Sequence, residues 1–332
     1  MNKIVLCLPY LIGSLFVSCV LMNIPAKAEE KSNCEYQEGR EHRIAFVVGV
    51  DDYSSKPNNA IKILGLGNLD RAKKDADKVA ESLKKVGFCV YRLENPNITY
   101  LLVKLADLQR SAKPDSVVVF YFSGHAFMNS GITYLVLSPS ENDGNNPNCN
   151  KNQTAVPMEC IDKVAISLEN DIQHRLGRAE NTSNGKKDDN KGFTLENDIQ
   201  HRLKRAENTS NGKKDDNKGF TIVIIDACRT QSPVKIEQGE NEYITDSKTL
   251  IAYATLPGRS AYEGIYKSYA DYLSELVTQS DLSVSELFDQ LANRISEDTK
   301  KYEKPQIPQI HKAITPDLYL GGKLPVRMIL RF

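Results

Sequence analysis

Short apolar runs alternate with amphipathic segments along most of the chain. The runs are rich in β-branched and aromatic residues and stop at polar residues or glycine, which is typical of buried strands. The segments between them repeat apolar residues every three or four positions, which is typical of helices with one buried face. The predicted strands are 43–49, 88–93, 116–122, 132–137, 220–225, 250–255 and an edge strand at 317–320, and the predicted helices are one from about residue 69 to Gly87, then 98–108, 269–277 and 284–295.

The order of these elements predicts the fold class. Strand, helix, strand, helix and strand follow one another from residue 43 to residue 122, and this alternation is typical of α/β proteins with a parallel sheet. We therefore expect a three-layer sandwich in which a mostly parallel sheet is flanked by helices. One domain over 43–322 accounts for the periodic segments, with an amino-terminal arm over 29–42 and a tail over 323–332.

A tandem repeat precedes the strand that ends before Asp226. The 27 residues that start at Ser167 recur from Thr194 with only two differences. Two copies are too few for a solenoid, in which three or more stacked units build the core. We interpret 167–220 as a duplication that inserts one extra unit of little functional weight. His174 and His201 lie inside it and are therefore poor catalytic candidates.

The first 28 residues predict a signal peptide. A lysine near the start precedes an uncharged apolar run over 4–24, and a small-residue cleavage site follows at 26–28. We expect an exported protein, periplasmic or secreted, without a stable membrane anchor after cleavage. A retained anchor is the rival interpretation because the run is long enough to span a membrane. A lipoprotein anchored through Cys19 is a weaker one.

Charge and cysteine content narrow the partners further. Lys and Arg number 43 and balance the 43 Asp and Glu residues, so no nucleic acid or anionic membrane is predicted as a partner. An odd number of cysteines follows the signal peptide, which in an exported protein suggests pairs plus one free thiol. Cys149 with Cys160 and Cys34 with Cys89 are suitable pairs, and Cys228 then remains free.

Two chemically suggestive motifs directly follow predicted buried strands. They are Gly124-His125 in one case and Cys228 in the other. A cysteine nucleophile needs a neighbour that takes its proton, usually a histidine. If the two strands are parallel neighbours, His125 as base and Cys228 as nucleophile meet at one sheet edge, with the N–H groups of Gly124 and Cys228 as oxyanion donors. Taken singly, a locally bonded loop histidine is the better interpretation of His125, and an inert buried cysteine is a frequent state. The pair of motifs at two strand ends reverses this preference.

A set of motifs resembles the caspase-like cysteine endopeptidases of clan CD, nearer to metacaspases and paracaspases than to true caspases. The motifs run from Arg43 to about Leu320 and are RIAFVVG, KKDAD, GFCVYRLEN, VVVFYFSGHA, VIIDACR and YATLPGRSAYEG. The resemblance implies a caspase-hemoglobinase fold. It also implies a catalytic His/Cys dyad, which falls on His125 and Cys228.

The resemblance bears on substrate specificity as well. True caspases carry a Gln two residues before the nucleophile, where this chain has Asp226. Asp75 matches an acid on the first helix of metacaspases and paracaspases, and Glu263 resembles a paracaspase acid. Helical geometry independently places Asp75 on the flank of the apolar stripe, whereas Asp70 and Asp77 point away. Carboxylates converging in a partly desolvated pocket bind a guanidinium or ammonium, so we predict cleavage after Arg or Lys; the alternative is three unrelated surface acids.

These observations leave three functions to weigh. The leading one is a cysteine endopeptidase for peptides or proteins with Arg or Lys before the scissile bond. The rival is a catalytically silent caspase-like interaction or regulatory module, suggested by the duplication and by the vulnerability of a free thiol to oxidation. A nucleotide-binding domain is disfavoured because acids, not glycines, follow the first strand. No cofactor is predicted; calcium activation, known in metacaspases, is not indicated, since Asp51-Asp52 is too generic.

Overall fold

The structure is a computed structural model that describes residues 5–6, 20–21, 41–54, 59–113, 116–129, 132–139, 165–167, 219–232, 249–261, 267–303, 305–312 and 318–321 of the 332-residue chain. The chain divides into two compact units, Met1–Glu35 and Tyr36–Phe332. In the first unit, β1 (Val5–Leu6) pairs antiparallel with β2 (Val20–Leu21). The predicted signal peptide and tandem repeat lie almost entirely outside the described residues, so they stay predictions.

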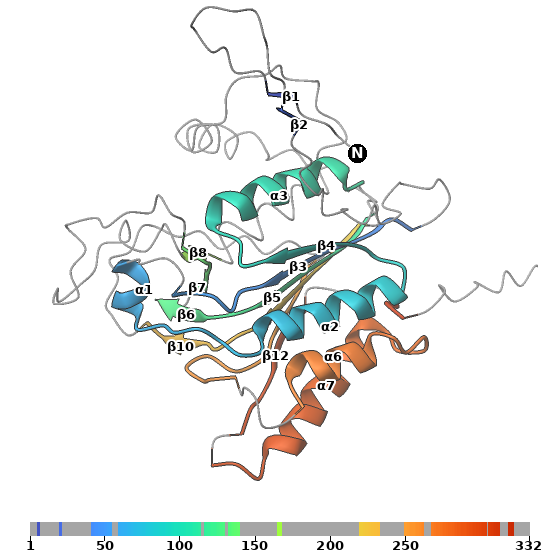
Figure 1. The fold of residues 1–332 in the computed structure, drawn as a ribbon. Coiled ribbons are helices and arrows are strands. Elements are labelled where there is room, and N and C mark those ends of the chain that lie inside the picture. The colour runs from blue at the N-terminus through green and yellow to red at the C-terminus, as the bar shows by residue number, and fades with distance from the viewer. Residues whose placement is uncertain are drawn as a thin grey trace, which may run out of the picture. The chain divides into compact units, whose positions relative to one another are not determined.

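A six-stranded sheet is the centre of the described part of the second unit. Its strands are β3 (Arg43–Gly49), β4 (Cys89–Glu94), β5 (Val117–Ser123), β9 (Phe220–Asp226), β11 (Thr249–Tyr253) and β12 (Gln309–Lys312). Their order is β12-β11-β9-β5-β3-β4, and only the β11–β12 pair is antiparallel. The predicted α/β fold with a mostly parallel sheet is confirmed (Figure 1).

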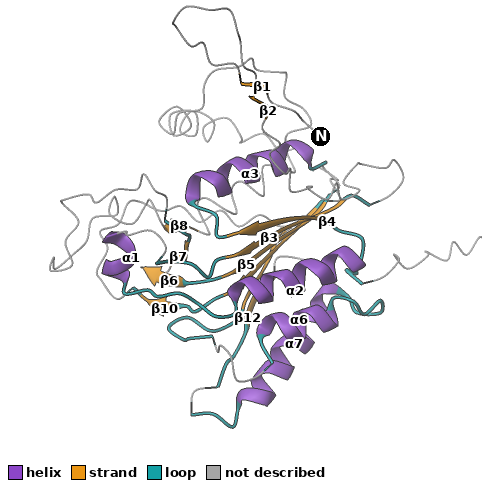
Figure 2. Ribbon diagram, in the orientation of Figure 1, coloured by secondary structure: helices purple, strands orange, loops and turns teal. Residues whose placement is uncertain are grey.

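Helices cover both faces of this sheet. One face carries α3 (Ile98–Ser111), and the other carries α2 (Ala72–Lys85), α6 (Tyr269–Leu276) and α7 (Val284–Thr299), as Figure 2 shows. Side chains of a strand point alternately to its two faces. In β3, Ile44 and Phe46 accordingly pack with α3, whereas Ala45 and Val47 pack with α2. The fully apolar strands predicted from the sequence are therefore strands buried on both sides.

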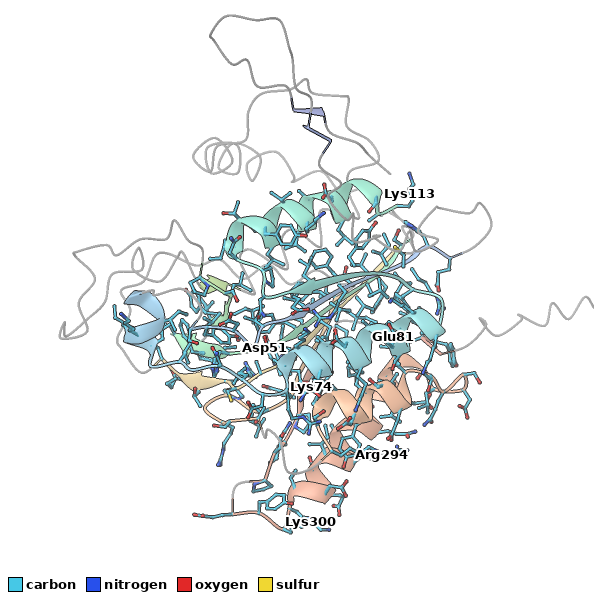
Figure 3. All side chains as sticks on the ribbon, viewed as in Figure 1. Asp51, Lys74, Glu81, Lys113, Arg294 and Lys300 are labelled. Atoms are coloured by element: carbon cyan, nitrogen blue, oxygen red, sulfur yellow. The ribbon has the colours of Figure 1, made fainter. Side chains whose placement is uncertain are left out.

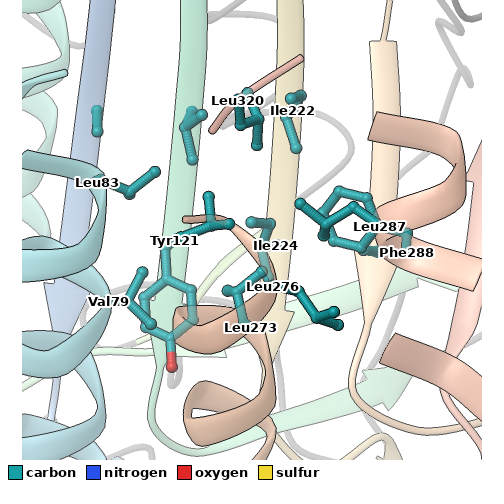
Figure 4. Packing of buried hydrophobic residues seen from close by; sticks show 14 of the residues in the cluster. Val79, Leu83, Tyr121, Ile222, Ile224, Leu273, Leu276, Leu287, Phe288 and Leu320 are labelled. Atoms are coloured by element: carbon teal, nitrogen blue, oxygen red, sulfur yellow. The ribbon is translucent and has the colours of Figure 1, made fainter. Parts of the chain in front are cut away.

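The core under α2, α6 and α7 surrounds Tyr121 of β5. Figure 4 shows its ring among Val79, Leu83, Ile222, Ile224, Leu273, Leu276, Leu287, Phe288 and Leu320. The burial of each such aliphatic or Phe side chain contributes about 1.5–3 kcal/mol. The Tyr121 hydroxyl points away from the labelled apolar residues. Exposed charged residues such as Lys74 and Arg294 lie on the outer surfaces of the helices (Figure 3).

The ends of the helices follow local signals in the sequence. After α2 the chain passes through Gly87, whose φ of 88° is in the left-handed region that favours glycine. The predicted capping box Ser283–Glu286 starts α7. A second capping box, formed by Ser268 and Asp271, starts α6. Both boxes place an acidic side chain in the first turn, where the helix dipole favours it.

A second, smaller sheet lies beyond the carboxyl ends of β5 and β9 in the chain. Its strands are β6 (Ala126–Asn129), β7 (Ile132–Val136), β8 (Ala165–Ser167) and β10 (Thr230–Gln231), in the order β10-β6-β7-β8. Only β7 was predicted from the sequence. β6 and β10 are too short to give a periodic signal, and they exist because each pairs with a neighbouring strand.

Two expectations about short elements are wrong. The edge strand is β12 and not 317–320; Leu318 and Leu320 are apolar because they are buried in the core, and Tyr319 makes only a single bridge to Ser283. The segment after β3, for which no helix is predicted, contains α1 (Asn59–Leu64), whose apolar residues join the core on the α3 side. Within the described residues, none of the helices is long and apolar enough to cross a membrane.

Candidate active site

Two segments of the chain run in register through both sheets. In the large sheet β5 is parallel to β9, and Ser123 pairs with Asp226. In the small sheet β6 is parallel to β10, and Phe127 pairs with Thr230. The members of each pair are 103 residues apart in sequence. His125 and Cys228 have the same separation, so they occupy corresponding positions in the short gap between the two paired regions. The requirement that their strands be parallel neighbours is thus met.

Two hydrogen bonds hold His125. Its Nε2 lies 2.8 Å from the carbonyl oxygen of Gly67, and its backbone N–H donates to the Tyr53 hydroxyl at 2.8 Å. A carbonyl only accepts hydrogen bonds, so Nε2 carries the hydrogen and the neutral ring has its lone pair on Nδ1. Burial lowers the pKa of His125 below its ordinary value of 6.5, against the opposing effect of the Gly67 bond. The ring is therefore mainly neutral near pH 7.

Tyr53 explains why residue 124 is a glycine. Tyr53 is buried, its ring centroid lies 4.7 Å from that of His125, and its hydroxyl donates to the Val136 carbonyl at 3.3 Å. A Cβ atom on Gly124 would lie 2.7 Å from the Tyr53 hydroxyl and 2.8 Å from Cζ of Phe122. In the structure its close neighbours are Tyr53 and Phe122.

Cys228 is a half-buried free cysteine whose Sγ lies 3.9 Å from the Ala261 carbonyl oxygen. The main chain after it is fixed by Arg229, which donates its N–H to Arg259 at 2.8 Å and accepts from the Gly258 N–H at 2.7 Å. Among the described cysteines, Cys89 is disulfide-bonded. The predicted partners Cys34, Cys149 and Cys160 lie outside the described residues.

The side chain of Arg229 adds to this fixation. The residue is only 4% exposed, and its guanidinium carbon lies 3.7 Å from the centroid of the Tyr253 ring. Its Nη1 donates to Oε1 of Gln309 at 2.6 Å. A buried cation on an aromatic face is a strong contact, so the segment that carries Cys228 is tied to β11 and β12.

Two of the three predicted pocket acids act electrostatically on the hydroxyl of Tyr121. Asp75 on α2 is 7% exposed, whereas Asp70 and Asp77 are exposed, as the helical geometry predicts. The Tyr121 hydroxyl donates to Oδ2 of Asp226 at 2.7 Å. Burial raises the pKa of Tyr121 well above its ordinary range, and the negative charges of Asp226 and Asp75 raise it further. Asp226 thus contacts this hydroxyl, and the negative charge of Asp75 also acts on it. Glu263, the third predicted acid, lies outside the described residues.

The sequence did not point to three residues that contact the candidate site residues. Tyr53 is an aromatic residue in a polar segment, which was a usable but weak signal. Tyr121 was hidden in an apolar strand, because the sequence does not show where its hydroxyl ends. Gly67 contributes a carbonyl that any residue could supply, so no signal in the sequence could have identified it.

The acidic pair Asp51-Asp52 has a structural partner. Oδ1 of Asn95 accepts hydrogen bonds from both backbone N–H groups, and its Nδ2 donates to Asp51 Oδ1 at 2.8 Å. These contacts tie the end of β3 to the residue that follows β4. Among the described residues, no group of three or more His, Cys, Asp or Glu side chains is arranged to hold a metal ion.

A six-stranded, mostly parallel sheet with helices on both faces is consistent with a caspase-like fold. The model of the caspase domain family matches residues 42–165 and 185–319, which is more than half of the chain. The chain therefore belongs to the caspase domain family of peptidases, whose substrates are proteins and peptides. Residues 166–184, between the two matched segments, fall almost entirely within the first copy of the tandem repeat. No curated protein sequence matches the chain.

Proposed function

We propose that the protein is a cysteine endopeptidase in which Cys228 is the nucleophile and His125 the general base and acid. The observation that supports this most strongly is the common separation of 103 residues on both sides of the pair. Strand pairing before and after the gap limits how far the two residues can move apart. A histidine and a free half-buried cysteine at matched positions are the two groups that acyl transfer through a thioester needs.

The hydrogen bonds of His125 suit a base. Because Nε2–H donates to Gly67, Nδ1 of the neutral ring takes the proton from the Cys228 thiol. The thiolate then attacks the peptide carbonyl, and the imidazolium returns the proton to the leaving amine as the C–N bond breaks. Water then attacks the resulting thioester and gives a proton to His125, the C–S bond breaks to release the acid, and the imidazolium returns the proton to the Cys228 thiolate.

Backbone N–H groups of Gly124 and Cys228 are the proposed oxyanion donors. They follow β5 and β9, which are parallel, so they lie in corresponding parts of the two segments. Preorganised donors of this kind contribute about 3–4 kcal/mol each to transition-state stabilisation. The hydrogen bonds of the Arg229 backbone support this role because they hold the peptide next to Cys228 in place.

The proposed specificity is for Arg or Lys before the scissile bond. Asp226 accepts a hydrogen bond from the Tyr121 hydroxyl and the charge of Asp75 acts on the same hydroxyl, which supports a shared, partly buried site of negative charge. Burial raises the pKa of Asp75 above its ordinary value of 3.8, more than the Ser268 hydrogen bond and the Arg71 charge lower it. The negative charge of its carboxylate is thus only partly neutralised by the chain's own groups, and a substrate cation neutralises it further. Glu263 is proposed as a third acid of this pocket.

We further propose that the protein acts outside the cytoplasm, in the periplasm or as a secreted enzyme. The support is the predicted signal peptide over 1–28. Expression of the full chain in a bacterial host, followed by amino-terminal sequencing of the exported form, tests this. A mature protein that starts at Glu29 is expected, and an uncleaved cytoplasmic product would contradict the proposal.

Fluorogenic peptides ending in Arg, Lys or Asp test the peptidase function. Under reducing conditions, with and without calcium, we expect the Arg and Lys peptides to be cleaved and the Asp peptide to be spared. Cys228→Ala and His125→Ala are each expected to lower kcat by at least about 10³-fold. Arg cleavage that persists in Cys228→Ala refutes the assignment. No turnover under any condition, together with stable binding of a protein partner, supports the silent module instead.

A further inference from the structure

Asp75 is paired with a cation of its own chain. Arg71, the residue that precedes α2, lies with its Nη2 3.5 Å from Oδ1 of Asp75 and 3.3 Å from Oδ2 of Asp271. Its side chain is about one quarter exposed. A guanidinium is thus already present at a carboxylate that the proposed function assigns to the guanidinium or ammonium of a substrate.

The contacts of Asp75 leave half of its carboxylate open. Ser268, which starts α6, donates its hydroxyl to Oδ1 of Asp75 at 2.9 Å, and this is the oxygen that Arg71 faces. Within the described residues, Oδ2 of Asp75 has no hydrogen bond. The side chain is 10% exposed.

Asp271 holds Arg71 from the other side. Its Oδ2 accepts from the Ser268 backbone N–H at 2.7 Å as part of the capping box, and its Oδ1 is paired with Lys78. Among the described residues, Lys78 forms an ion pair with Asp271 and none with Asp75. The chain therefore provides two cations in one network, of which only Arg71 touches the predicted pocket acid.

We infer that Arg71 is a specificity-determining residue, which occupies Asp75 in the ligand-free protein and competes with the substrate cation for this carboxylate. The inference rests on the proposed function, because it takes Asp75 as a residue that binds Arg or Lys. Two cations cannot both make close contacts with one half-open carboxylate without mutual repulsion. The entering cation therefore binds less tightly than Asp75 and Asp226 alone would allow, and Arg71 limits how strongly cationic substrates are held.

Arg71→Gln removes the competing charge and keeps a polar side chain. We expect it to tighten the binding of a small cation about three- to tenfold, the range typical of a partly exposed ion pair. Lys78→Gln is the matched control, because it removes one positive charge from the same network without touching Asp75. It is expected to change binding less than about twofold. Arg71→Lys, which retains the charge, is expected to stay close to the parent.

The experiment is calorimetric titration of benzamidine into the full chain carrying Cys228→Ala, which prevents turnover and self-cleavage. Arg71→Gln, Arg71→Lys, Lys78→Gln and Asp75→Asn are compared in that background, after circular dichroism shows that each is folded. Tighter binding in Arg71→Gln alone, and loss of binding in Asp75→Asn, are the expected results.

Two outcomes separate the inference from the pocket on which it rests. If benzamidine binding depends on Asp75 but is unchanged or weaker in Arg71→Gln, the role of Arg71 is refuted and the pocket is retained. Benzamidine binding that Asp75→Asn does not change, or no benzamidine binding in any variant, refutes the pocket itself. An equal gain in Lys78→Gln also overturns the inference, because it means that net charge and not occupancy of Asp75 sets the affinity.

Discussion

The Tyr53 hydroxyl is hydrogen-bonded to the main chain at His125, and its removal is expected to lower the free energy of unfolding. Tyr53→Phe deletes the acceptor of the His125 N–H, at 2.8 Å, and a donor to the Val136 carbonyl, at 3.3 Å. Tyr53 is 1% exposed. A buried N–H left without its partner costs about 1–3 kcal/mol. We expect the free energy of unfolding to fall by this amount.

Gly124→Ala perturbs the same place from the opposite side. The new Cβ atom would lie 2.7 Å from the Tyr53 hydroxyl oxygen and 2.8 Å from Phe122 Cζ, both below normal contact distance. Overpacking of a filled interior costs about 1–3 kcal/mol. The expected loss of stability is therefore similar to that of Tyr53→Phe, although the mechanism is a clash and not a lost hydrogen bond.

The double variant tests whether these two effects share an atom. Tyr53→Phe removes the oxygen nearest to the added Cβ atom, so Gly124→Ala should cost less in that background. We expect the sum of the two single-variant losses in free energy of unfolding to exceed the loss in the double variant by about 0.5–3 kcal/mol. The measurement is equilibrium urea unfolding of the full chain in the Cys228→Ala background. Gly124→Ala combined with Tyr91→Phe is the control and should be additive, because Tyr91 lies on β4, separated from β5 by β3. Additivity within about 0.5 kcal/mol in the test pair refutes the reasoning.

Three further predictions follow from buried charged groups. Burial lowers the pKa of His125 below 6.5, so kcat/KM should rise with pH through a midpoint below 6.5, and a midpoint above it in a pH–rate profile would contradict the assignment of His125 as base. Burial raises the pKa of Asp75 in the folded protein above its ordinary value of 3.8. The protonated carboxyl therefore stabilises the folded protein below pH 3.8, and this stabilisation is lost as the pH rises through the folded-state pKa. Asp75→Asn should therefore leave stability at pH 7 unchanged or higher in urea unfolding while Arg-peptide cleavage falls, and a loss above about 1 kcal/mol would count against this. Arg229→Met should cost about 1–3 kcal/mol in urea unfolding through lost Tyr253 and Gln309 contacts, and Gln309→Ala less; equal costs would show that the stacking on Tyr253 contributes nothing.

The long elements of the fold were predictable because their patterns are strong and local. Strands such as β5 and β9 are apolar on both faces, and α2 repeats its buried residues at helical spacing. β12 was missed because its pairing with β11, not its own composition, makes it a strand. Leu318 and Leu320 led to a wrong strand prediction for the converse reason. They are apolar because they are buried in the core, and they are not part of a paired strand.

The candidate site was predictable only as far as strand ends determine it. His125, Cys228 and Asp226 were found because each follows or ends a buried strand, and Asp75 because helical geometry places it beside an apolar stripe. The contacts that orient His125 come from Gly67 and Tyr53, in a segment whose path depends on tertiary packing. Arg71 was not anticipated for the same reason, since Asp271 lies 200 residues further along the chain.

The matched pairing around His125 and Cys228 also sets when this site comes into existence. The two residues are joined by contacts between segments 103 residues apart, and contacts of such long range form late because a long chain segment must first be closed. During synthesis His125 emerges well before Cys228, so a growing chain contains the proposed base without the proposed nucleophile. A fragment that ends within the tandem repeat never contains Cys228. Completion of the fold is thus itself a condition for any chemistry of this pair.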